Sequence, residues 1–135
     1  MHTRFRRELS ALPAVFAMSE EFCARDETLE SEKYTLDFVL EEIFTNLVKY
    51  GSGEDDEILI SIDQKGQELV LSVTDFSALP FDMRDAAAPD VTLPLEERTP
   101  GGLGIHLVRR MVDRLDYDYD AEHKKSTITI YKEVR

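Results

Sequence analysis

An acidic residue and an amide residue, Glu42 and Asn46, stand four positions apart within the segment EEIFTNLVKY. In a helix this spacing places both side chains on one face. They lie close to an apolar stripe, where a polar group buried without a partner costs about 1–3 kcal/mol. A bound ion or ligand would supply that partner. The alternative, that both side chains lie at the edge of the stripe and face water, fits the spacing equally well.

A second acidic residue, Asp75, ends the alternating segment ELVLSVTD. A carboxylate at the end of a strand can accept a hydrogen bond from an amino group of a ligand. Aspartate is also one of the residues that commonly start a turn. Taken alone, the position of Asp75 therefore favours the turn over the binding site.

Three glycines, Gly101, Gly102 and Gly104, precede an apolar-periodic segment in TPGGLGIHLVRR. Glycine allows close approach of the backbone to a ligand. The first N–H groups of the helix that follows have no partner within the helix, and this end of the helix dipole is positive. Such a terminus binds phosphate. The spacing matches neither the P-loop nor the dinucleotide fingerprint, and a flexible hinge explains the glycines equally simply.

The elements that must position these residues follow from the hydrophobic period. A period of three to four predicts helices, with Leu9 and Leu107 among the inward residues, and a period of two predicts strands. We expect helices over 9–25 (starting near Ala11), 34–50 (with Gly51 as a C-cap) and 103–115, a loop over 26–33, strands over 57–63, 68–75, 116–122 and 126–134, and an irregular segment over 76–100. Lys65-Gly66-Gln67 joins the first two strands as a hairpin. This order predicts one sheet covered by helices on one face, a two-layer α/β sandwich in a single domain.

Composition limits the function classes. The 135 residues include 28 acidic and 16 basic ones, for a formal net charge of −12. That charge opposes direct binding to nucleic acid and to anionic membranes, because both require Lys and Arg to neutralise phosphates. We see no signal peptide and no apolar run long enough to span a membrane. The single cysteine, Cys23, is expected to be a packed thiol, and a reducing cytoplasm is the expected location.

The order of the three clusters resembles the GHKL superfamily, the group of ATPases and kinases that includes gyrase and the histidine kinases. The segment EEIFTNLVKYG resembles its N box, and PLEERTPGGLGIHLVRRMVD resembles its final glycine box. The resemblance extends from about residue 5 to residue 134 and is strongest to anti-sigma-factor serine/threonine kinases and related stand-alone ATP-binding regulators. It implies an α+β fold, with a mixed sheet and helices on one face, for a single domain over 1–135.

The resemblance implies roles for the three polar residues introduced above. Glu42 matches the general base that activates a substrate hydroxyl. Asn46 matches the residue that coordinates Mg²⁺, and Asp75 matches the acid that accepts a hydrogen bond from the adenine amino group. These roles suit the chemistry, since phosphoryl transfer depends mainly on positioning and on neutralisation of charge.

The resemblance also implies a set of residues around ATP. Lys49 and Tyr50 would lie near the phosphates and the ribose, and residues 82–100 would form a lid. The glycine box, with Leu103 among its glycines, would wrap the phosphates. A hydroxyl on the last strand would lie beside Asp75, with Thr127 as the first candidate and Ser126 as the other. The nucleotide-binding residues implied in this way, in addition to Asn46 and Asp75, are Lys49, Tyr50, Ser77, Gly101, Gly102, Leu103, Gly104 and Thr127.

One departure from the family pattern leaves two functions open. Ser77 stands where the family usually has glycine next to the adenine, and one extra residue precedes Pro80-Phe81-Asp82. The first hypothesis is a Mg-ATP-dependent serine/threonine kinase that phosphorylates a STAS-type anti-anti-sigma protein and binds a sigma factor. The second is a nucleotide-gated switch module with weak or no catalysis. A detached histidine-kinase domain is less favoured, because no helix with a phospho-accepting histidine precedes residue 9. A homodimer is compatible with the resemblance.

Overall fold

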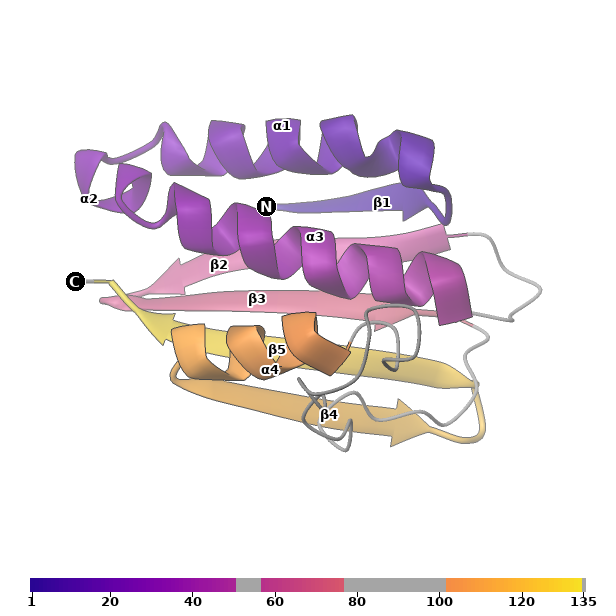
Figure 1. Ribbon diagram of the computed structural model, residues 1–135. Helices are drawn as coiled ribbons and strands as arrows, with labels where there is room; N and C mark the ends of the chain where they lie inside the picture. The colour runs from indigo at the N-terminus through magenta and orange to yellow at the C-terminus, as the bar shows by residue number, and fades with distance from the viewer. Residues whose placement is uncertain (51–56, 77–101, 135) are drawn as a thin grey trace.

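The computed structural model describes residues 1–50, 57–76 and 102–134, with the backbone alone for residues 49, 50 and 102–105 (Figure 1). The predicted Gly51 cap and the predicted lid over 82–100 lie outside the described residues. The strands are β1 (His2–Arg6), β2 (Glu57–Lys65), β3 (Glu68–Asp75), β4 (Arg114–Asp120) and β5 (Lys125–Glu133). The helices are α1 (Leu12–Cys23), α2 (Glu27–Glu30), α3 (Lys33–Tyr50) and α4 (Gly102–Met111), and a 3-10 turn, η1 (Leu9–Ala11), precedes α1.

The strands form one sheet in the order β1-β2-β3-β5-β4, with helices over one face (Figure 1). The two-layer sandwich and the α+β class are confirmed. Each strand pair among the described residues is antiparallel, so the expected mixed sheet is wrong. A parallel pair needs a crossover connection, whereas here the connection from β3 through α4 places β4 at the edge and lets β5 return beside β3 antiparallel.

The first strand, β1, was not predicted. It pairs with β2 antiparallel, with Phe5 opposite Ile58. Its sequence HTRFR contains one apolar residue, and Phe5 is the only one of its five residues that is buried. A lone buried residue gives no alternation to detect, so only the pairing with β2 reveals the strand.

Strands β2 and β3 form the predicted hairpin. Gly66 in its turn has a φ of +63°, a backbone conformation that glycine adopts without strain. Buried residues alternate with more exposed ones along β2 as far as Ile62 and along β3 as far as Val73. Alternation buries one face of each strand under the helices. The buried residues that these strands contribute are Ile58, Ile60, Ile62, Leu69, Leu71 and Val73.

Helix α3 occupies the centre of the helical layer and contacts both α1 and α4 (Figure 1). Its bounds agree with the prediction for 34–50. It buries Leu36, Val39, Leu40, Ile43, Phe44 and Leu47. The ring of Phe44 meets that of Phe5 edge to face, with the ring centroids 6.5 Å apart. Helix α3 therefore packs into the core along most of its length.

The smaller differences from the sequence analysis lie near the surface. Residues 27–30 form the short helix α2 instead of a loop, and Asp26 caps it by accepting a hydrogen bond from the Thr28 N–H at 3.0 Å. Leu9 and Leu107, which the period placed inward, are 50% and 39% exposed.

Cys23 is packed in the core as expected, and burial raises the pKa of its thiol. The extent of the domain stays a prediction.

A buried ion pair joins the start of the α3 layer to the sheet. Glu32 precedes α3, and its Oε2 lies 2.6 Å from Nζ of Lys132 on β5, with side chains 5% and 14% exposed. Charges that are removed from water need a partner, and loss of one partner of a buried pair is strongly destabilising. This pair therefore holds the first turn of α3 against the sheet.

We expect Lys132→Met to lower the free energy of unfolding by about 3 kcal/mol, because the buried Glu32 carboxylate loses its countercharge. Urea denaturation followed by circular dichroism measures the change. Lys33→Met is the matched control: it removes the more exposed pair with Asp37, whose side chains are 37% and 27% exposed, and should cost less than about 1 kcal/mol. Equal losses in the two variants would show that the Glu32–Lys132 pair has no special role.

Candidate functional site

Glu42 and Asn46 lie on one face of α3, as their spacing predicts. The Asn46 Nδ2 group donates a hydrogen bond to Oε1 of Glu42 at 3.1 Å. Asn46 is 5% exposed, and Glu42 is partly buried. The alternative that both face water is therefore wrong for Asn46. In this orientation the Asn46 carboxamide turns its nitrogen to Glu42 and leaves Oδ1 as the atom for a cation.

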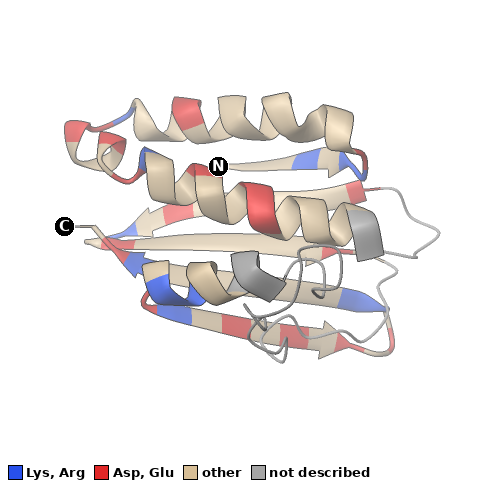
Figure 2. Cartoon of the chain, viewed as in Figure 1, with Lys and Arg blue, Asp and Glu red and all other residues tan. Residues whose placement is uncertain are grey.

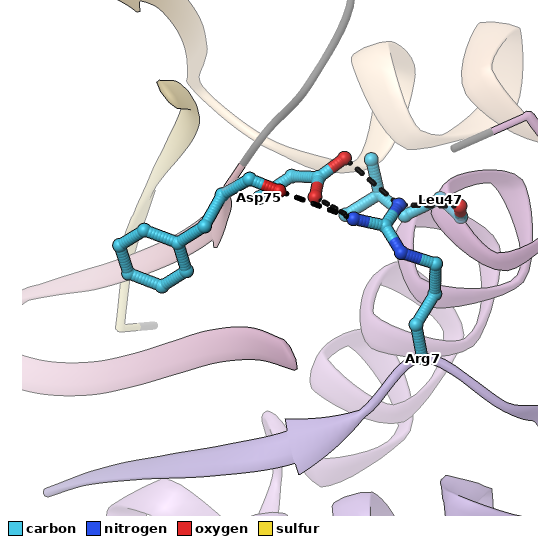
Figure 3. A network of polar contacts seen from close by, with 4 residues as sticks. Arg7, Leu47 and Asp75 are labelled. Atoms are coloured by element: carbon cyan, nitrogen blue, oxygen red, sulfur yellow. Dashed lines mark hydrogen bonds and ion pairs between the residues drawn. The ribbon is translucent and has the colours of Figure 1, made fainter. Parts of the chain in front are cut away.

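Asp75 lies at the end of β3 and is bound by Arg7, which follows β1 (Figure 3). The two guanidinium nitrogens of Arg7 donate one hydrogen bond to each carboxylate oxygen, and that from Nη1 to Oδ2 measures 3.0 Å. The two side chains are 7% and 3% exposed. Two parallel N–H bonds between a guanidinium and a carboxylate are the strong form of this pair, so the Asp75 side chain is held firmly.

Arg7 also joins Asp75 to α3. Its Nη1 donates to the carbonyl oxygen of Leu47 at 3.1 Å, and its Nη2 donates to that of Phe76 at 3.5 Å (Figure 3). Leu47 lies in the last turn of α3, where carbonyl groups lack a partner within the helix. Asn46 is the residue before Leu47. Arg7 thus ties the end of the strand that carries Asp75 to the helix that carries Glu42 and Asn46.

Sequence reasoning missed Arg7. It belongs to the basic run RFRR, in which nothing separates a buried arginine from its exposed neighbours Arg4 and Arg6. The signal that could have found it is indirect: a strand-end aspartate that is buried needs a cation, and the sequence supplies few candidates near the predicted core. Only the pairing of β1 with β2 brings Arg7 beside the end of β3.

The structure corrects the placement of Thr127. Asp75 pairs with Ser126 across β3 and β5, whereas Thr127 pairs with Thr74. Successive residues of a strand point to opposite faces, so Thr127 lies on the face away from Asp75. Its Oγ1 is 3.3 Å from that of Thr74. Ser126, 5% exposed, is the hydroxyl residue on the Asp75 face, so the expectation for Thr127 is wrong in its position.

The glycine box lies mostly outside the described side chains. Helix α4 begins at Gly102 and lies next to α3 (Figure 1). Gly102, Leu103 and Gly104 are in its first turn, so the helix N-terminus lies within the glycine run, one residue before the predicted start at 103. Lys49 and Tyr50 are in the last turn of α3. Ser77 and Gly101 lie outside the described residues.

The two arginines of this helix occupy its other end. Arg109 and Arg110 are in the last turn of α4 and are exposed. There they complement the negative end of the helix dipole. They do not lie at the N-terminus of α4, where the glycines are.

A separate acidic group lies on the turn between β4 and β5. Among the described residues, Asp120, Glu122 and His123 hold their ligand atoms within 4.8 Å of one another. Asp120 accepts hydrogen bonds from the N–H groups of Glu122 and His123, at 3.1 and 3.3 Å, and its Oδ2 lies 2.7 Å from Nδ1 of His123. The hydrogen bond from the His123 side chain is the main cause that lowers the pKa of Asp120. These contacts account for the turn without a metal.

The arrangement at α3 and β3 combines three capacities. A partly buried carboxylate can take a proton, a carboxamide oxygen can hold a hard cation, and a fixed carboxylate can accept a hydrogen bond from an amino group.

The described helices include none that is both long and apolar enough to cross a membrane.

Comparisons with known proteins identify the family and the fold. The family described as "Histidine kinase-like ATPase domain" matches residues 5–132. The chain is 27% identical, over 100 residues, to the serine/threonine-protein kinase BtrW of Bordetella bronchiseptica, a match that covers 73% of this chain and 70% of that protein. The histidine kinase AdeS of Acinetobacter baumannii has a similar fold, with a TM-score of 0.52 and 15% identity, over 100% of this chain and 68% of the other.

The family match covers most of the chain, including both halves of the site on α3 and β3. The family consists of ATPase domains, which implies ATP as the ligand, and similarity to a serine/threonine kinase supports a kinase-like function. This chain belongs to the histidine kinase-like ATPase domain family of the GHKL superfamily.

Proposed function

We propose that this protein is a Mg-ATP-dependent serine/threonine protein kinase of the anti-sigma-factor type. The observation that carries the proposal is the hydrogen-bonded pair Glu42–Asn46 on α3, tied through Leu47 and Arg7 to Asp75 on β3. The proposed general base and the proposed cation ligand thus lie on α3, and the proposed acceptor for the adenine amino group lies on β3. Family membership and the similarity to BtrW support the same function.

Asn46 is the proposed Mg²⁺ ligand. Mg²⁺ prefers oxygen ligands, is bound by few protein groups and keeps several waters and phosphate oxygens. The donor set fits: the Asn46 nitrogen is turned to Glu42 at 3.1 Å, so the carboxamide oxygen is the atom that would hold the ion. ATP with bound Mg²⁺ supplies the phosphoryl group and neutralises charge on the phosphates. The Glu42 carboxylate only accepts hydrogen bonds, so its contact with Asn46 sets this orientation of the carboxamide.

Glu42 is the proposed general base. Its carboxylate would accept the proton of a serine or threonine hydroxyl on the substrate, so that the hydroxyl oxygen could attack the γ-phosphorus of ATP and displace ADP. The hydrogen bond from Asn46 fixes the position of Glu42 Oε1. One helical turn thus holds the base next to the cation ligand.

The remaining residues bind the nucleotide. Asp75 accepts from the adenine amino group, and Ser126 lies on its face of the sheet. Lys49 and Tyr50, in the last turn of α3, are assigned to the surroundings of the phosphates and the ribose. The N-terminus of α4 binds phosphate through its N–H groups, with Gly101, Gly102, Leu103 and Gly104 around the phosphates and Ser77 near the adenine. These assignments rest on the family resemblance and on the positions of α3 and α4.

The proposed partner is a STAS-type anti-anti-sigma protein that carries the phosphorylated hydroxyl, together with a sigma factor, in a cytoplasmic partner-switching system. The net charge of −12 supports a protein partner over nucleic acid. Among the described residues, acidic positions occur on both helices and strands (Figure 2). A homodimer is part of the same proposal.

A second candidate function is a nucleotide-gated switch that binds its partner with weak or no catalysis. Two observations favour it. Ser77 replaces the family's glycine, and one extra residue precedes Pro80-Phe81-Asp82. Under this proposal nucleotide binding alters partner affinity, and phosphate is not transferred.

The Glu42→Gln variant tests the kinase directly. We expect phosphate transfer to fall by about 10²–10⁴-fold, because glutamine keeps the size and the hydrogen bond with Asn46 but cannot take the proton. The measurement is transfer of labelled phosphate from Mg-ATP to purified STAS-domain proteins of the source organism, and ATP affinity by calorimetry should stay unchanged.

Glu41→Gln, at the exposed neighbouring position on α3, is the matched control. Transfer that survives Glu42→Gln at the parent rate would remove Glu42 as the base. Tight ATP binding by the parent with no transfer to any STAS-domain protein would favour the switch.

The corrected position of Ser126 gives a further prediction. We expect Ser126→Ala to weaken ATP binding by about threefold to tenfold, the loss of one hydrogen bond near the adenine. Thr127→Ala, on the opposite face, should leave the affinity within about twofold, since it loses only the contact with Thr74. Calorimetric titration with Mg-ATP compares the two. The reverse order of effects would show that the nucleotide lies on the other face of the sheet.

A further inference from the structure

Arg7 ties α3 to Asp75 in the function proposed above, but it has no part there in recognising the nucleotide, although it makes a two-fold charged contact with Asp75. It donates to both oxygens of Asp75 and, in addition, to the carbonyls of Leu47 and Phe76 (Figure 3). Both charged side chains are almost fully removed from water. Any ligand that uses Asp75 therefore meets a carboxylate that Arg7 already orients.

The chemistry of a carboxylate decides whether the two contacts compete. An ionised carboxylate has about four lone-pair sites on its two oxygens. The guanidinium of Arg7 takes one on each oxygen, which leaves a further site on each for another donor. The amino group of a base can therefore bind while Arg7 stays in place.

Displacement of Arg7 by the base is the less favourable course. An amino group donates a single bond from a neutral nitrogen, whereas Arg7 donates two charge-assisted bonds. Its departure would also leave the Leu47 carbonyl, in the last turn of α3, without this donor. Arg7 consequently affects the binding of the base through the Asp75 carboxylate that it orients.

We propose that Arg7 is a positioning residue that sets base selectivity: it holds the Asp75 carboxylate so that it accepts from a 6-amino purine and rejects a 6-oxo purine. The oriented carboxylate offers only acceptor atoms, and a 6-oxo group brings a second acceptor against them. Without Arg7 the buried carboxylate has no countercharge there and turns away. This inference rests on the proposed function, because it assumes that Asp75 faces the base of a nucleotide.

Titration with Mg-ATP and with Mg-ITP, which carries a 6-oxo group, tests the inference. We expect the parent to prefer ATP by at least about tenfold, the value of a hydrogen bond to a charged group. Arg7→Met should bring this preference below about threefold by weakening ATP alone, while the dissociation constant for ITP stays within about twofold. Arg7→Lys, which keeps the charge without the fork, should give an intermediate preference.

Three further variants serve as controls. Arg6→Met changes the exposed neighbour of Arg7 and should leave the preference unchanged. Asp75→Asn removes the carboxylate, so adding Arg7→Met to it should change the preference no further if Arg7 acts through Asp75. This double variant carries no unpaired buried charge, and it serves if Arg7→Met alone fails to fold. Thermal melting confirms that each variant is folded at the titration temperature.

The outcomes separate this inference from the proposed function. Equal weakening of ATP and ITP by Arg7→Met would mean that Arg7 is only structural, and tighter ATP binding would mean that it competes with the base; either result overturns the inference. A parent that binds ATP without preference over ITP overturns it as well. A parent that binds neither nucleotide overturns the proposed function itself.

Discussion

The buried ion pair between Arg7 and Asp75 is the constraint on which the site depends. It joins three parts of the chain that are far apart in sequence: the segment after β1, the last turn of α3 and the end of β3. A buried pair of this kind adds little net stability by itself, but removal of one partner costs about 3–5 kcal/mol because a charge is left without its counterion. The main effect of the pair is therefore to fix the relative positions of these three parts of the chain. It places the helix with Glu42 and Asn46 against the strand end with Asp75.

Helix α3 combines the core and the site in one element. Its apolar side packs among β1, β2, β3 and the neighbouring helices, and Glu42 and Asn46 stand at the margin of that side. Because the core fixes the rotation of the helix about its axis, it also fixes the direction of these two side chains. The ion pair between Glu32 and Lys132 holds the first turn of the same helix, and Arg7 holds the last. The positions of Glu42 and Asn46 are therefore set by the packing of α3 and by two buried ion pairs.

The spacing of residues in the sequence predicted those elements whose structure depends on neighbouring residues alone. The apolar spacing in residues 34–50 gave α3, and alternation with Gly66 gave the β2–β3 hairpin. The four-residue spacing placed Glu42 and Asn46 together. Patterns failed where long-range pairing decides: β1 has a single buried residue, and the antiparallel return of β5 has no local signature. Arg7 and the choice of Ser126 over Thr127 depend on strand register, in which a shift of one residue reverses the face.

The central claim is that α3 and β3 form a site for Mg-ATP in which Asn46 holds the metal ion. Calorimetric titration of the parent and of Asn46→Ala with ATP, in Mg²⁺ and in EDTA, tests it most directly. We expect the parent to bind ATP more tightly in Mg²⁺ than in EDTA. We expect Asn46→Ala to lose at least about tenfold in affinity, the value of a strong polar contact, and to lose the dependence on Mg²⁺. An Asn46→Ala variant that binds Mg-ATP with the affinity of the parent would contradict it.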